Sequence, residues 1–145
     1  SYDLSNVFTG NLKEMKIFFC GVMVSIAGFM SSPFFSIYAA TKAALKVFIE
    51  SVNVELVKAG SSNRILNVRK KKIKGTSFSA GKTDLNVTAP MAQLIIEHLE
   101  KKDDLFIPQY DEVFKNVLER YHTAFRAEGM HSYEYKQKSG RMTEN

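Results

Sequence analysis

A tyrosine and a lysine lie four positions apart in the segment "SIYAATKAAL" (36–45), as Tyr38 and Lys42. In a helix, four residues turn slightly more than a full circle, so these two side chains would share one face. A free phenol ionises only near pH ~10, and a cation within a few ångströms stabilises the phenolate. Tyr38 could then exchange a proton with a reacting alcohol or carbonyl group.

A serine lies thirteen residues before the tyrosine, as Ser25 in "VMVSIAG". If the fold brings it to Tyr38, its hydroxyl could donate a hydrogen bond to the same substrate oxygen. A tyrosine and a lysine at this spacing also occur by chance in many helices. The residues alone leave two interpretations open: a catalytic Ser–Tyr–Lys constellation, or an ordinary helix.

The elements around these residues are clearly patterned. The near-continuous apolar run 17–25 predicts a strand buried on both faces, as in a parallel sheet. Residues 26–36 read as a loop, and 37–58 form the clearest helix, with Ser36 as N-cap and Gly60 at the C-terminal end.

The rest of the chain continues the alternation of strands and helices. The predicted segments are a strand at 64–68, a polar connection at 69–88, a helix at 89–101 with Pro90 in its first turn, a strand at 105–110, a helix at 111–129 ended by Gly129, and a polar tail at 130–145. Two interpretations of the tail stay open: a flexible end, or a segment that covers a neighbouring subunit or a substrate pocket. This order predicts an α/β fold with a parallel sheet and right-handed crossovers. Ligands bind such sheets outside the carboxyl ends of the strands, where Ser25 and the 69–88 connection fall.

Length and composition fit one domain covering residues 1–145. A single cysteine, Cys20, excludes an internal disulfide and a cysteine-based zinc site, and it favours a reducing, cytoplasmic location. No apolar run reaches the ~18 residues needed to span a membrane, and the first ten residues do not resemble a signal peptide. We therefore expect no membrane partner.

The segment "VMVSIAGFMSSPFFSIYAATKAALKVFIESVNVEL" resembles the short-chain dehydrogenase/reductase family. The family pattern is a serine after a buried strand, followed thirteen residues later by Tyr-x-x-x-Lys. "AALKVFIESVNVEL" also resembles the family helix, and "NRILNV" resembles its next strand. The resemblance covers about residues 17–128 and is most specific over 22–58.

This resemblance implies a Rossmann-type fold and an oxidoreductase that interconverts a secondary alcohol and a ketone with NAD or NADP. It implies that Tyr38 is the general acid/base, that Ser25 holds the substrate oxygen, and that Lys42 favours ionised Tyr38 while binding the nicotinamide ribose. It also places Ile73 and Thr76 beside the nicotinamide, so the implied cofactor-binding residues are Tyr38, Lys42, Ile73 and Thr76.

The sequence departs from the family in three places. It contains no G-x-x-x-G-x-G turn, so the phosphate cradle of the family's N-terminal βαβ half is lacking. "VRKKKIKGT" stands where the family has Pro-Gly. The family's catalytic asparagine has only Asn6 as a candidate, too near Ser25 for a full intervening helix. We therefore expect the C-terminal catalytic half of such an enzyme, with impaired or incomplete activity.

A second hypothesis is a non-catalytic remnant that acts as an oligomerisation or interaction module. The helix at 37–58 carries apolar residues on more than one face, which favours a homo-oligomer, either a dimer or a tetramer. The basic run "RKKKIK" (69–74) permits phosphate or nucleic-acid contacts, but a solvated loop is the simpler interpretation, and few aromatic residues support nucleic-acid binding.

The histidines and the aromatic residues of the last predicted helix do not indicate a functional site. The three histidines, His98, His122 and His131, lack metal-ligand spacing, so we expect no metal site. The aromatic residues of the last helix recur at helical spacing and are expected in the core: Phe114, Tyr121 and Phe125.

Overall fold

The computed structural model describes residues 10–11, 14, 16–69 and 85–139. Its elements in chain order are β1 (Cys20–Met23), the 3-10 turn η1 (Ile26–Gly28), α2 (Ser36–Lys58), β2 (Ile65–Val68), α3 (Leu85–Glu100), β3 (Leu105–Phe106), the π-helical turn η2 (Tyr110–Phe114) and α4 (Lys115–Lys138). The expected order of strands and helices is confirmed.

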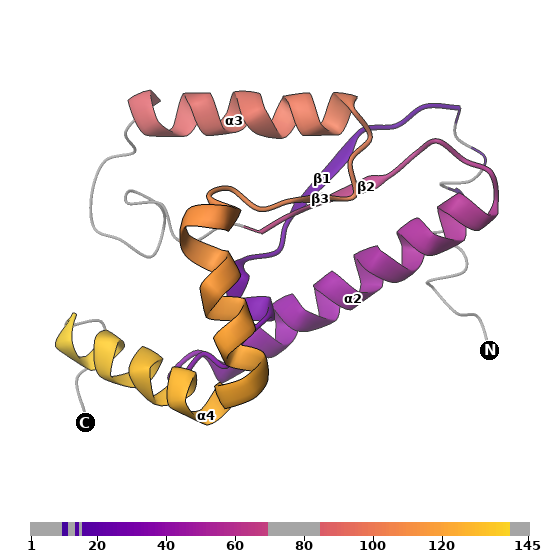
Figure 1. Ribbon diagram of the computed structural model, residues 1–145. Helices are drawn as coiled ribbons and strands as arrows, with labels where there is room; N and C mark the ends of the chain where they lie inside the picture. The colour runs from indigo at the N-terminus through magenta and orange to yellow at the C-terminus, as the bar shows by residue number, and fades with distance from the viewer. Residues whose placement is uncertain (1–9, 12–13, 15, 70–84, 140–145) are drawn as a thin grey trace.

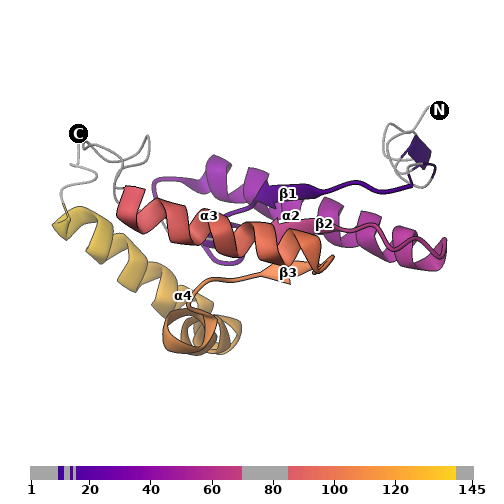
Figure 2. The ribbon, with the colours of Figure 1, turned by 90° about the horizontal axis from the view of Figure 1, so that it is seen from above.

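The three strands form one parallel sheet in the order β1-β2-β3. Cys20 of β1 lies opposite Ile65 of β2, and Asn67 of β2 lies opposite Leu105 of β3. Figure 1 shows α3 on one side of the sheet and α2 on the other, and Figure 2 shows the same layers from above. The chain is therefore an α/β protein with a three-stranded parallel sheet flanked by helices, consistent with a partial Rossmann-like fold.

The two helices that connect the strands cover opposite faces of the sheet. Even-numbered residues of β1 pack toward α2, whereas a Cβ on Gly21 would lie 3.4 Å from Leu99 of α3. The connections β1–α2–β2 and β2–α3–β3 both move to the next strand in the same direction across the sheet. Because their helices lie on opposite faces, the two crossovers have opposite handedness. The expectation of right-handed crossovers thus holds for only one of them.

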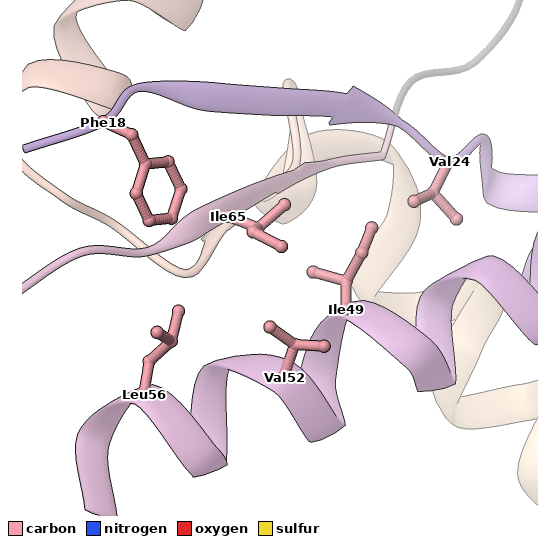
Figure 3. Packing of buried hydrophobic residues seen from close by; sticks show 6 residues of the cluster. All are labelled: Phe18, Val24, Ile49, Val52, Leu56 and Ile65. Atoms are coloured by element: carbon pink, nitrogen blue, oxygen red, sulfur yellow. The ribbon is translucent and has the colours of Figure 1, made fainter. Parts of the chain in front are cut away.

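The main core lies between the sheet and α2. Figure 3 shows six of its side chains in the space between the strands and α2: Phe18, Val24, Ile49, Val52, Leu56 and Ile65. All four residues of β2 are buried, because this strand has a neighbour on each side and a helix over each face. That is why the sequence of β2 is almost continuously apolar. The same was expected of the strand at 17–25 but is wrong: β1 is only four residues long, and Gly21 and Met23 on its α3 side are exposed, because α3 covers that face only in part.

A buried asparagine fixes how α2 lies on β2. The Asn53 amide donates to the Ile65 carbonyl (2.9 Å) and accepts from the Ile65 amide N–H (2.8 Å). Both polar atoms of the amide are therefore satisfied in a site that excludes water. The pair of bonds holds one point of the helix against one point of the strand.

The ends of α2 confirm one sequence expectation and correct another. Gly60 follows the helix at φ 72°, a left-handed conformation that glycine adopts without steric cost, and its N–H donates to the Val57 carbonyl. Ser36 is not the N-cap: it is the first helical residue, and Phe35 precedes it without a side-chain cap. The Ala39 N–H still bonds to the Phe35 carbonyl, so the backbone begins the helix unaided.

The second half of the chain departs further from expectation. Helix α3 begins at Leu85, four residues before the predicted start, so Pro90 lies inside the helix. Strand β3 contains only Leu105–Phe106, since the chain turns at Pro108. Pro90 was expected in the first turn but is the sixth residue of α3, where it lacks the backbone N–H that would donate one helical hydrogen bond.

Helix α4 continues through the glycine that was expected to end it. A Cβ on Gly129 would lie 2.9 Å from the Ser31 hydroxyl, so this glycine allows a close approach to the loop 29–35. The helix runs on to Lys138 and bends at Ala124, where φ is −141° and ψ is 46°. Phe114 is buried as expected, but Phe125 is exposed, so its place in the core was predicted wrongly.

Two valines of α2 provide a test of the core. Val52 is 2% exposed and Val47 is 56% exposed. We expect Val52→Ala to lower the free energy of unfolding by about 2 kcal/mol, because it removes buried methyl groups and leaves a cavity. Val47→Ala, the matched control, should change it by less than about 0.5 kcal/mol. Urea unfolding followed by circular dichroism measures both, and equal effects would contradict the described packing.

Candidate active site

The first turns of α2 bring Tyr38 and Lys42 together at the carboxyl end of β1. The Lys42 Nζ lies 5.7 Å from the centre of the Tyr38 ring and donates a hydrogen bond to the Met23 carbonyl (2.9 Å). Met23 is the last residue of β1, and Ser25 follows two positions later. The lysine thus connects the tyrosine-bearing helix to the strand that leads into the serine.

Ser25 has an unusual backbone conformation. Its φ is 83° and its ψ is 144°, in a region that residues with a Cβ rarely adopt. Its hydroxyl accepts a hydrogen bond from the Ala27 N–H (3.3 Å), which begins the turn η1. Such strain persists only where the surroundings fix the backbone, and it concentrates at functional sites.

The turn after Ser25 packs directly on the backbone of α2. A Cβ on Gly28 would lie 2.8 Å from the carbonyl carbon of Lys42 and 3.0 Å from the amide nitrogen of Ala43. Only glycine permits this approach, since backbone atoms in a helix cannot move aside. Gly28 therefore holds the segment that follows the serine against the turn that carries the lysine.

Helix α4 holds the loop 29–35, which joins Ser25 to Tyr38. The hydroxyl of Tyr121 accepts a hydrogen bond from the Ser31 N–H (3.0 Å). The Lys136 Nζ donates to the Ser32 hydroxyl (2.8 Å) and to the Pro33 carbonyl (2.9 Å).

An aromatic contact completes this attachment, because the rings of Phe34 and Tyr133 stack with their centres 4.6 Å apart. Local sequence patterns do not predict these contacts, because the partners are about a hundred residues from the loop in the chain. Their proximity depends on the bend of α4 at Ala124.

Arg69 is the first residue of the basic run, and it is buried. Its guanidinium lies 3.7 Å from the centre of the Phe29 ring and donates to a Glu50 carboxylate oxygen (2.8 Å). Burial lowers the pKa of this guanidinium, and the negative charge of Glu50 opposes that effect. For this residue the simple interpretation as a solvated loop was wrong. Residues 70–74 of the run lie outside the described part of the chain.

Other predicted site residues also lie outside the described residues: Asn6, Ile73 and Thr76. Tyr38 and Lys42 are therefore the described residues that could contact a nicotinamide cofactor. Cys20 packs against the main core, and burial raises the pKa of its thiol, which keeps it protonated and unreactive.

Across the described ranges, no cluster of three histidine, cysteine, aspartate or glutamate side chains is placed to hold a metal ion. In the same part of the chain, every helix is too short or too polar to cross a membrane.

Comparisons with known proteins do not assign this arrangement to a family. No protein-family model, no curated protein and no solved structure matches the chain. Its fold and local geometry define the chain as an α/β protein in which a serine, a tyrosine and a lysine lie near the carboxyl ends of a parallel sheet.

Gly28 offers a test of this local packing. We expect Gly28→Ala to lower the free energy of unfolding by about 1–3 kcal/mol, because the new methyl group forces the turn and α2 apart. Gly21→Ala is the control: its Cβ would meet only the mobile end of Leu99, at an ordinary contact distance. Thermal unfolding of both variants measures the difference. A Gly28→Ala protein as stable as the Gly21→Ala protein would contradict the close approach.

Proposed function

We propose that the chain carries the proton-transfer residues of an oxidoreductase of the short-chain dehydrogenase/reductase type. The substrate would be a secondary alcohol or a ketone, and the cofactor would be NAD or NADP. The single observation that supports this best is the position of Lys42 Nζ, which lies 5.7 Å from the Tyr38 ring centre and donates a hydrogen bond to the Met23 carbonyl, two residues before Ser25.

The residues divide the chemistry between them. In ketone reduction, Tyr38 would donate its hydroxyl proton to the substrate oxygen as the carbonyl becomes an alkoxide. Ser25 would hold that oxygen, and Lys42 would stabilise the phenolate that remains. The nicotinamide, when bound, would supply the hydride. In alcohol oxidation the same proton would return to Tyr38.

We expect this chain to bind its cofactor with low affinity. The 145 residues include no G-x-x-x-G-x-G turn to hold the pyrophosphate, so this chain should bind NAD or NADP poorly and turn over slowly. A cytoplasmic location belongs to the proposal, because the single cysteine cannot form an internal disulfide. A dimer or tetramer belongs to it as well, since α2 exposes several large apolar side chains: Ile37, Val47, Phe48 and Val54.

Ketone reduction by the purified chain tests the role of Tyr38. With saturating NADH or NADPH and a series of test ketones, we expect turnover well below the ordinary range of about 1–1000 per second. Tyr38→Phe should lower the remaining rate by about 100-fold or more, because it removes the proton donor. Tyr110→Phe is the control, since Tyr110 is equally exposed and lies far along the chain. Equal rates in the two variants would remove Tyr38 from the mechanism, and rapid turnover by the unmodified chain would refute its impairment.

A non-catalytic interaction module is the second candidate, and one observation favours it. Within the described residues, β1 pairs on one side only, and the face of β1 turned toward α3 exposes Met23, as well as Phe19 directly before the strand. Ile17, just before the strand, is also exposed. An unpaired strand edge beside apolar side chains favours association with another strand.

Calorimetric titration of the folded chain with NAD and with NADP separates the two candidates. Weak, saturable binding that Lys42→Met abolishes is expected for the oxidoreductase, because the lysine would contact the nicotinamide ribose. Lys46→Met, one turn further along the same helix, should leave binding unchanged. No heat of binding from a folded sample would instead favour the interaction module.

A further inference from the structure

A cavity of about 370 Å³ lies between α2 and the β2–β3 side of the sheet. Its volume falls in the range of small-molecule sites. Its walls come from the middle of α2, from β2 and the residue after it, and from the start of β3: Glu50, Asn53, Val54, Val57, Asn67, Arg69, Asp104 and Leu105. The lining does not include Ser25, Tyr38 or Lys42.

One lining residue carries a buried amide that no other described group satisfies. Asn67 is 1% exposed, and both its Oδ1 and its Nδ2 lack a hydrogen-bond partner. The other buried asparagines behave differently: Asn53 bonds to both polar groups of Ile65, and Asn63 accepts from the Phe18 N–H. Unpaired buried amides are rare, because each loses its hydrogen bonds to water.

A second unpaired donor lies on the same side of the sheet. Arg69 follows Asn67 by two positions, so the alternation of the strand directs both side chains to the face that α2 covers. The Arg69 Nε is buried and has no partner, while Nη2 of the same guanidinium binds Glu50. Contacts with Phe29 and Glu50 fix the orientation of this group.

We propose that this cavity binds a neutral small molecule that carries an amide group and a short aliphatic substituent. An amide offers one acceptor and one donor, which is the complement of the free Asn67 amide, and its oxygen can also accept from the Arg69 Nε. The ligand is neutral because the charged groups that line the cavity already have partners: Glu50 pairs with Arg69 and Lys46, and Asp104 pairs with Arg64. The aliphatic part meets the apolar walls of Val54, Val57 and Leu105, which are otherwise exposed.

Nuclear magnetic resonance of the ¹⁵N-labelled full chain tests the site with defined probes. Isobutyramide carries the amide and the branched aliphatic group. Two molecules of similar shape serve as controls: 3-methyl-2-butanone keeps the acceptor but lacks the donor, and isobutyrate replaces the amide with a charge. We expect isobutyramide to shift the Asn67 side-chain amide resonances in a saturable way, at least tenfold more tightly than either control.

Matched substitutions place the effect at this residue. Asn67→Leu and Asn67→Ala should each abolish the saturable shift of the surrounding backbone resonances. Asn67→Leu should also keep or raise the melting temperature, because it replaces an unsatisfied amide with an apolar group. Asn53→Leu is the control, and it should lower the melting temperature, since the Ile65 N–H and carbonyl lose their partners.

The outcomes decide the proposal without reference to dehydrogenase activity. Saturable binding of isobutyramide that depends on Asn67 supports it, whether or not Tyr38 proves catalytic. No shift at Asn67 with any probe, as expected if only ordered water satisfies the amide, would overturn it. Equal binding of the ketone control would overturn the requirement for a donor, and binding retained by Asn67→Ala would overturn the assigned residue.

Discussion

The two hydrogen bonds between Asn53 and the backbone of Ile65 determine where the rest of the molecule lies. They hold α2 to the central strand at a single register, and the surrounding apolar side chains then pack around that point. Helix α2 returns along the sheet against the strand direction, so its N-terminal turns reach the carboxyl end of β1. The position of Tyr38 and Lys42 is thus a consequence of a polar contact about three to four helical turns away.

Much of the first half of the fold could be predicted from the sequence. The apolar run of β2, the periodicity of α2 and the glycine that follows it are local signals, and each matched the structure closely. The run 17–25 does contain a strand, but only Cys20–Met23 form it, and its burial on both faces was predicted wrongly. The second half of the fold was harder to predict from the sequence. The start of α3, the short β3 and the passage of α4 through Gly129 depend on contacts between distant segments, which local propensity does not encode.

In the candidate site, too, some features could be predicted from the sequence and others could not. Helical spacing predicted that Tyr38 and Lys42 share a face, and their closeness in the structure agrees. The strained backbone of Ser25, the burial of Arg69 and the unpaired amide of Asn67 could not be read from the chain, because each arises from tertiary packing. Arg69 is instructive: a run of basic residues usually marks a solvated segment, but an aromatic ring and a carboxylate make its first member part of the interior.

The attachment of the loop 29–35 to α4 has a consequence for the order in which the molecule forms. The contacts of Tyr121, Tyr133 and Lys136 with this loop join segments separated by about a hundred residues. Contacts of such sequence separation cost more loop-closure entropy than local contacts do. During synthesis, the loop between Ser25 and Tyr38 leaves the ribosome about a hundred residues ahead of these partners, and it gains them only after α4 has followed. The contact between Asn53 and Ile65, which are 12 residues apart, forms without that delay.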